Sequence, residues 1–307
     1  MSLVLVEFQK KIFKMNDFWI ILTASIVAIN AALLGCFLLL RKMAMVGDAI
    51  SHAVLPGIVA AYYFSGDKTS SLLLVGATLT GVLASFIIDF LSRKAKIQGD
   101  ASIGITYTLL FALGMIMISG WMKGNVDIDM ECVLYGDIAL INLDKVVVDG
   151  NLYLGPRAFF VEIVAFFIIA FCLIFGYKGF KVLSFNEDYA RSLGINTGKW
   201  HYALMTLVSL TTVVAFEVVG AILVVGFLII PPATAQLVTT RLKAMMLWAC
   251  IFGIISVVIG YYLAILFNVS ITGAMVSVAG LIFFTTLFVT RYRKLVRKEV
   301  KYQTLKA

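Results

Sequence analysis

The chain has 307 residues, of which 62% are hydrophobic and only 14% are charged. Soluble domains are about half apolar and about a quarter charged, so this composition argues against a soluble enzyme or binding module. The mean hydropathy of +1.01 and several apolar runs of about 20 residues, the length that crosses a bilayer, indicate a polytopic membrane protein. The net charge of +8 comes from short Lys/Arg stretches between apolar blocks, which indicates membrane topology and not nucleic-acid binding.

Eight apolar blocks follow one another along the chain, and the sixth is long enough to turn back on itself. We therefore predict an all-α bundle of eight or nine transmembrane helices. In the sixth block we expect a bend at Phe216–Gly220 and an unwound or kinked end at Ile229–Ala235, because Pro231 and Pro232 interrupt helical hydrogen bonding. The blocks cover residues 18–40, 43–64, 71–91, 102–121, 157–176, 203–238, 244–266 and 270–290.

The charges between the blocks predict the side of the membrane on which each loop lies. Lys and Arg are enriched in cytoplasmic loops, so we expect residues 92–100, 239–243 and the tail 291–307 in the cytoplasm. Alternation of the spans then makes the loop 177–202 cytoplasmic as well, and this loop also carries an excess of basic residues.

The segment 121–157 is acidic instead, and we expect it outside the cytoplasm. Alternation would also put residues 1–17 outside, but their lysines argue against this, so the side of the N-terminal segment stays open. No loop is long enough to form its own core, and residues 18–290 are expected to form a single transmembrane domain. The acidic residues are Asp127, Asp129, Glu131, Asp137, Asp144 and Asp149, and the lysines are Lys10, Lys11 and Lys14.

The second block contains an acid and one of the chain's two histidines. Asp48, His52 and Pro56 recur every four residues, so on a helix they share one face. A carboxylate in hydrocarbon is costly and usually faces a partner or a water-filled path. Carboxylate oxygen and imidazole nitrogen are ligands for zinc, manganese or ferrous iron, and Pro56, as a helix-kinking residue, would leave the carbonyl oxygen of His52 free.

Two interpretations of this pair stay open. Asp48 and His52 either bind a passing metal ion or only hydrogen-bond each other and adjacent helices. One chain supplies two side-chain ligands here, too few for a complete site, whereas a symmetric dimer would supply four. Glu217 is a weaker metal-ligand candidate, which either lines the same path or lies at the membrane edge beside the expected bend.

The loop 184–201 carries the signature of a short helix that must dock on something to be stable, either on a partner or, as a simple connector, on its own bundle. Asn186 is the expected N-cap, acids follow it at the positive end of the helix, and Gly194 is the expected C-terminal stop. Asp89 and His201 lie near the cytoplasmic interface and are expected to be solvated. The acids are Glu187 and Asp188, and Tyr189, Ala190 and Leu193 form one short apolar face.

The stretch Gly194–Trp200 only superficially suggests a nucleotide-binding loop. The spacing of its glycines is one residue too short, and Trp200 stands where Ser or Thr must reach magnesium. If ATP drives transport, another polypeptide must hydrolyse it, so the chain itself is not expected to be an enzyme.

These residues resemble the permease subunits of ATP-binding-cassette importers for manganese, zinc or iron. The most specific element is "GDAISHAVLPG" (Gly47–Gly57), which resembles the second-helix signature of that family. Further segments follow in the family's order: "GDASIGITYTLLFALGMIMIS" (99–119), "LYGDI" (134–138), "EDYARSLGI" (187–195), "VVGAILVVGFLIIPPATAQLV" (218–238) and "SITGAMVSVAGLIF" (270–283).

The resemblance implies a fold similar to that of the vitamin and siderophore importer permeases, in a bacterial cytoplasmic membrane. It implies a second permease copy or a paralogue, two cytoplasmic ATPase subunits and an extracytoplasmic metal-binding protein as partners. Glu187, Asp188, Tyr189, Ala190, Leu193 and Gly194 would form the helix that couples to the ATPase. Asp48 and His52 would line the pathway of a transported ion, with no permanently bound cofactor.

Three alternatives remain at this stage. The chain could be a proton- or potential-driven metal carrier that uses Asp48, His52 and Glu217, an importer permease for a metal chelate or a vitamin, or a membrane scaffold or receptor that transports nothing. The last leaves the intramembrane acid and histidine without a task.

Overall fold

The computed structural model describes most of the chain, and the outcomes below concern those residues. Outside the description lie residues 1, 67–70, 122–137, 142–144, 149–151 and 305–307. All of the acidic residues predicted for the segment 121–157 fall in these gaps, as does Cys132.

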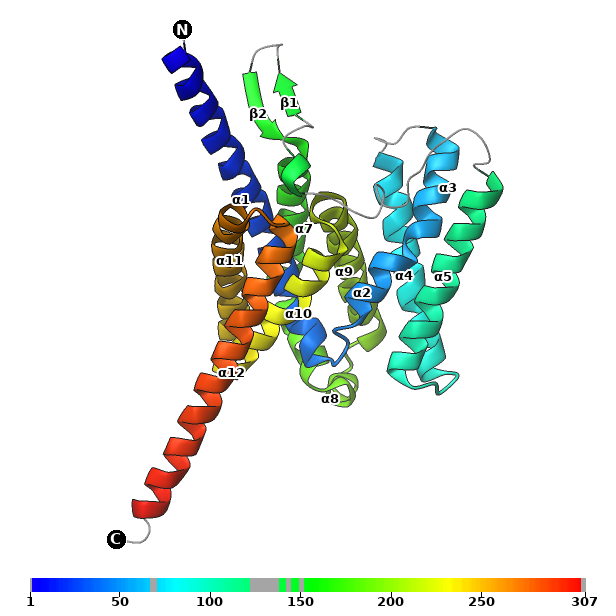
Figure 1. Ribbon diagram of the computed structural model, residues 1–307. Helices are drawn as coiled ribbons and strands as arrows, with labels where there is room; N and C mark the ends of the chain where they lie inside the picture. The colour runs from blue at the N-terminus through cyan, green and yellow to red at the C-terminus, as the bar shows by residue number, and fades with distance from the viewer. Residues whose placement is uncertain (1, 67–70, 122–137, 142–144, 149–151, 305–307) are drawn as a thin grey trace.

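The described residues form a bundle of α-helices with one small hairpin, as the all-α prediction requires (Figure 1). The strands β1 (Lys145–Val148) and β2 (Leu152–Pro156) pair antiparallel, and a short 3-10 turn, η1 (Ile138–Leu140), precedes them. The helices are α1 (Ser2–Leu40), α2 (Val46–Ala53), α3 (Leu55–Ser65), α4 (Ser71–Arg93), α5 (Gly99–Trp121), α7 (Arg157–Phe185), α8 (Glu187–Ser192), α9 (Thr197–Val219), α10 (Ala221–Val238), α11 (Leu242–Phe267) and α12 (Ile271–Thr304).

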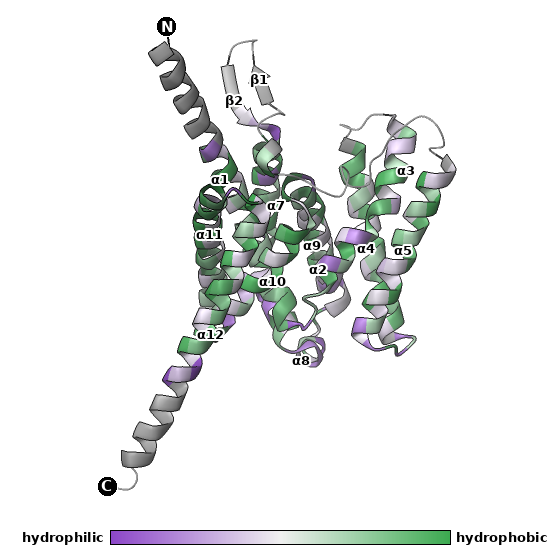
Figure 2. Cartoon of the chain, viewed as in Figure 1, coloured by the Kyte–Doolittle hydropathy of each residue, from purple (hydrophilic) through white to green (hydrophobic). Residues whose placement is uncertain are grey.

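Eight helices in the described part are long and apolar enough to cross a membrane. Figure 2 shows apolar residues along these helices and hydrophilic residues on α8 and on the α4–α5 link. The second apolar block is not one of the eight, because it is divided into α2 and α3 at Val54. The eight long helices agree with the predicted range of eight or nine, and the divided block is where a ninth passage is expected.

The sixth block does turn back, and the turn is at Gly220. This residue has φ 76° and ψ 167°, a conformation that favours glycine, and its N–H caps α9 by donating to Phe216 O at 3.0 Å. The expected bend at Phe216–Gly220 is thereby confirmed at its last residue.

The expected unwinding at Ile229–Ala235 is wrong, because α10 stays helical through Pro231 and Pro232 to Val238. A proline removes the hydrogen bond to the carbonyl four residues earlier, so Pro232 frees the oxygen of Leu228. Gly35 of α1 packs against that oxygen, and any side chain at position 35 would overlap it. The helix tolerates the prolines because a neighbouring glycine leaves room for the freed carbonyl.

Figure 1 shows the amino end of α1 and the β1–β2 hairpin on one side of the bundle. The helix α8, the α4–α5 link and the carboxyl end of α12 lie on the other side. The described residues of the basic stretches predicted to be cytoplasmic, 92–100 and 291–304, therefore share a side with α8. Residues 2–17 lead into the bundle from the side opposite to α8, as alternation of the spans predicts.

Close helix crossings at glycines hold α3, α4 and α5 against one another. A side chain at Gly57 of α3 would overlap Thr80 Oγ1 and the backbone oxygen of Gly76, both on α4. A methyl group at Gly114 of α5 would lie 2.8 Å from Leu55 Cγ of α3. Small residues at such crossings allow helix backbones to approach each other closely in lipid.

Gly57→Ala is expected to destabilise the protein, because the new methyl group has no room between α3 and α4. Overpacking of this kind costs about 1–3 kcal/mol, which should lower the Tm of the detergent-purified protein. Gly280→Ala in α12 is the control, since a methyl group there meets nothing within 4 Å. Equal Tm values for the two variants would contradict the crossing.

Candidate functional site

Helix α2 presents Asp48 and His52 one turn apart on the same face. The imidazole Nε2 lies 3.8 Å from the carboxylate Oδ1, and the side chains are 41% exposed for His52 and 39% for Asp48. The other side chains of α2 are buried against the bundle. The pair is therefore close enough to share one ion and is open on one side.

Two aromatic rings of α5 flank His52, which the sequence analysis did not anticipate. The ring centroid of Tyr107 lies 6.1 Å from that of the imidazole, and that of Phe111 lies 6.2 Å away at a right-angled orientation of 89°. Tyr107 and Phe111 are four residues apart on one helix, and only the fold shows that this face of α5 meets α2. The rings limit the orientations that the imidazole can take.

The interruption between α2 and α3 follows from Pro56. This proline lies in the first turn of α3, where a missing N–H costs no helical bond. The chain leaves the helix at Val54, whose carbonyl accepts from Gly57 N at 3.0 Å and from Ile58 N at 3.1 Å. His52 thus lies in the last turn of α2, just before the interruption.

The described residues contain no group of three or more His, Cys, Asp or Glu side chains placed to hold a metal ion. Asp48 and His52 alone offer one oxygen and one nitrogen ligand type, which is an incomplete set. Glu217 does not complete it. The side chain of Glu217 is exposed and lies three residues before the bend at Gly220, which favours the membrane-edge interpretation.

A second buried acid, Glu162 of α7, was missed by the sequence analysis. Its side chain is fully buried, and its Oε2 accepts a hydrogen bond of 3.0 Å from Asn30 Nδ2 of α1. The signal in the sequence is a single Glu inside the apolar run 158–176, paired with a single Asn inside the first block. This contact ties α1 to α7 and does not involve α2.

The short cytoplasmic helix forms as predicted. The Asn186 side chain accepts from Tyr189 N at 3.0 Å, which caps α8 at its first turn. At the other end Gly194 has φ 73°, with Gly194 N donating to Arg191 O and Ile195 N to Ala190 O. This pair of bonds is the Schellman arrangement that ends a helix at a glycine.

The apolar face predicted for this helix is divided. Ala190 is fully buried, which agrees with the alternative that this face rests on the bundle itself, and it leaves Ala190 out of any surface open to a partner. Tyr189 and Leu193 are 57% and 55% exposed, and Phe185 at the end of α7 is 56% exposed. These three exposed apolar residues lie at the end of α7 and on or directly after α8, and we call them together the α8 stripe.

Trp200, which excludes a nucleotide-binding loop, has a packing role instead. Its indole lies against Gly176 and Gly179 of α7, where a methyl group at position 179 would be 2.5 Å from Trp200 Cε2. Its ring meets Phe180 edge-on at 5.0 Å between centroids. The start of α9 is thereby fixed against α7.

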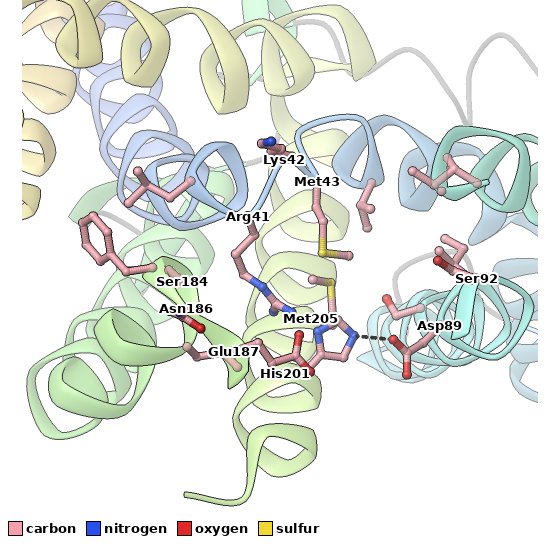
Figure 3. Close-up of a pocket in the computed structure, with 18 of the residues that line it drawn as sticks. Arg41, Lys42, Met43, Asp89, Ser92, Ser184, Asn186, Glu187, His201 and Met205 are labelled. Atoms are coloured by element: carbon pink, nitrogen blue, oxygen red, sulfur yellow. Dashed lines mark ion pairs between the residues drawn. The ribbon is translucent and has the colours of Figure 1, made fainter. Parts of the chain in front are cut away.

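A cavity of about 820 Å³ lies between α8 and the beginning of α2 (Figure 3). Its lining includes Arg41, Val46, Asp89, Glu187 and His201. The prediction that His201 is solvated is wrong, since the residue is only 2% exposed and its Nε2 lies 3.6 Å from Asp89 Oδ1. The packing of α4 against α9 covers a histidine that the sequence places at a membrane edge.

Comparison with known proteins finds similarity over nearly the whole chain. Residues 15–290 match the ABC 3 transport family. The manganese transport system membrane protein MntD of Bacillus subtilis is 40% identical over 287 residues, 92% of this chain and 95% of MntD. The zinc transport system membrane protein TroD of Treponema pallidum is 33% identical over 289 residues, 94% of this chain and 77% of TroD. The solved structure of PsaBC from Streptococcus pneumoniae in complex with Fab matches with a TM-score of 0.75 and 33% identity, covering 95% of this chain and 99% of that chain.

Asn186→Ala should loosen α8 by removing its N-cap. Loss of such a cap costs about 1 kcal/mol, which corresponds to about fivefold faster amide hydrogen exchange across residues 187–192. Ser192→Ala is the control, because the Ser192 hydroxyl only donates to Tyr189 O at 2.8 Å within the helix. Unchanged exchange in the Asn186 variant would show that packing alone holds α8.

Proposed function

The chain belongs to the ABC 3 transport family and is the membrane permease of an ATP-binding-cassette importer, and we propose that its cargo is a divalent transition-metal ion that passes Asp48 and His52. We take manganese as the first cargo to test. MntD, a relative named for manganese transport, is 40% identical to this chain.

The observation that carries this proposal is the pairing of Asp48 and His52 at 3.8 Å on a short helix beside an interruption. Oxygen and nitrogen ligands suit manganese, ferrous iron and zinc, whereas a soft-metal site would use thiolates. The described cysteines, Cys36, Cys172 and Cys250, lie on α1, α7 and α11 and not on α2. The available donors therefore favour a borderline or hard divalent ion.

A second permease chain completes the site in this proposal. Asp48 and His52 provide two ligands and leave about two-fifths of their side-chain surfaces exposed, at 39% and 41%. A second copy, or a paralogue, that brings an equivalent pair to the same place gives four ligands. The small, apolar remainder of α2 is buried and does not obstruct such an approach.

The energy for transport comes from a separate ATPase subunit, which we propose docks on the α8 stripe. Phe185, Tyr189 and Leu193 are exposed at one end of the molecule, on or beside the capped helix α8. An apolar surface of this kind suits a protein partner. On the opposite side, an extracytoplasmic metal-binding protein would deliver the ion.

Replacing either pair member should abolish metal uptake. In proteoliposomes holding the permease with its ATPase and binding protein, Asp48→Ala and His52→Ala are each expected to lower manganese uptake by about 10- to 100-fold, the loss seen when a group supporting a metal site is removed. Ser51→Ala on the same helix is the control, because the Ser51 hydroxyl only donates to Gly47 O at 3.0 Å.

If the wild type takes up zinc or iron in preference to manganese, manganese is the wrong cargo but the proposed site at Asp48 and His52 stands. Wild-type rates in both pair variants would overturn the role of Asp48 and His52 and favour a chelate or vitamin as cargo. Uptake by this chain without any ATPase would establish a secondary carrier instead.

Tyr189→Ser and Leu193→Ser should weaken the docking of the ATPase. Each removes an apolar side chain that is more than half exposed, at 57% and 55%. Truncation of a central interface residue costs about 1–2 kcal/mol or more, so the Kd of the permease–ATPase complex should rise about fivefold or more for each variant. Lys199→Ser, an exposed residue of α9, is the control, and an unchanged Kd in the Tyr189 and Leu193 variants would move the docking site elsewhere.

A further inference from the structure

Both histidines of the chain lie beside an aspartate, and only one of these pairs has a role in the proposed transport site. The second pair joins α9 to α4, with His201 Nε2 at 3.6 Å from Asp89 Oδ1. The next residue of α9, Tyr202, donates its hydroxyl to Asp89 Oδ2 at 3.3 Å. One carboxylate of α4 thus contacts two consecutive side chains of α9.

The α9 side of this contact is joined directly to α8. Helix α9 begins at Thr197, five residues after α8 ends, and Arg191 Nε of α8 donates to Thr197 Oγ1 at 3.4 Å. His201 lies in the second turn of α9. The link between α8 and α9 is therefore short and is held by a hydrogen bond across it. A movement of α8 would be passed through this link to the turn of α9 that carries His201.

The α4 side is joined to the helices of the metal pair. A methyl group at Gly81 of α4 would lie 3.1 Å from Ile50 Cγ2 of α2, and the crossing of Gly57 and Gly76 joins α4 to α3. Ile50 lies between Asp48 and His52 in the sequence. Because these contacts are made by backbone and short side chains, α4 and α2 cannot easily move independently of each other.

The cavity borders the contact between His201 and Asp89, and both residues line it. Figure 3 shows the imidazole of His201 directed at Asp89, with Arg41, Met43 and Met205 around it. Residues of α8 and the first residue of α2, Val46, line the space of about 820 Å³. Helix α9 follows α8 and packs on both α2 and α4, and the Asp89 contacts are part of its packing on α4.

We propose that Asp89, His201 and Tyr202 form a latch that transmits movement of α8, where the ATPase docks, to the helices that carry Asp48 and His52. The latch residues are positioning residues and do not touch the transported ion. This inference rests on the proposed function, because it assigns the latch to ATP-driven transport.

The test measures the metal ions transported per ATP hydrolysed by the reconstituted importer. Asp89→Asn and His201→Gln keep a polar side chain of similar size and remove the contact between the Asp89 carboxylate and the His201 imidazole. Each is expected to lower the ratio about tenfold while ATP hydrolysis continues, within the range of about 5- to 150-fold typical of coupled sites. The double variant should be no worse than either single variant, because both changes break one contact.

Ser92→Ala, on α4 and lining the same cavity, is the matched control and should keep the wild-type ratio. A parallel fall of uptake and ATP hydrolysis in the latch variants would show a merely structural role and overturn the proposal, as would an unchanged ratio. If neither latch variant can be purified, Tyr202→Phe removes one donor and keeps the ring. It should lower the ratio about two- to threefold, and an unchanged ratio there would equally overturn the latch.

The two proposals can fail separately. If the cargo or its site is wrong, the wild type shows no metal uptake, or Asp48→Ala has no effect. If only the latch is wrong, wild-type uptake and its dependence on Asp48 persist while the ratio is insensitive to Asp89 and His201.

Discussion

Helix α2 is held in place by close contacts with its neighbours, made where a glycine of one helix meets a side chain of another. A methyl group at Gly47 would lie 2.7 Å from Leu228 Cδ1 of α10, and Ile50 packs on Gly81 of α4. A helix of eight residues is unstable alone, so these contacts, and not its own hydrogen bonds, keep it formed. Asp48 and His52 lie on the face that the contacts leave open, and their 3.8 Å separation therefore depends on packing by α4 and α10.

The lipid environment also explains how the chain accommodates its prolines. A bilayer offers no water to a carbonyl that a proline has released, so the protein must accommodate it. At Pro56 the chain uses an interruption at Val54, which ends α2 directly after His52. At Pro232 the helix continues, and Gly35 of α1 leaves space for the released carbonyl of Leu228. Proline therefore interrupts the chain beside the helix that carries Asp48 and His52 and leaves α10 intact.

Features encoded by local pattern could be predicted from the sequence: the apolar spans, the shared face of Asp48 and His52, the cap at Asn186 and the turn at Gly220. Features that depend on contacts between distant segments could not. Tyr107 and Phe111 are two aromatic residues among many until α5 is placed beside α2. His201 looks solvated at a membrane edge until α4 covers it, and Ala190 looks like part of a docking face until α8 turns it inward. The continuation of α10 through Pro231 and Pro232 could not be predicted, because Gly35, which leaves room for the released carbonyl, lies nearly two hundred residues away in the chain.

The central claim is that one metal ion is shared by the Asp48–His52 pairs of two permease chains. The most direct measurement is the stoichiometry of manganese bound to the purified two-permease complex, read together with the pulsed electron paramagnetic resonance signal of nitrogen ligands. The account predicts one ion per two chains, with histidine nitrogen coupling that disappears in His52→Gln. One ion bound per chain, or nitrogen coupling that persists without His52, would contradict it.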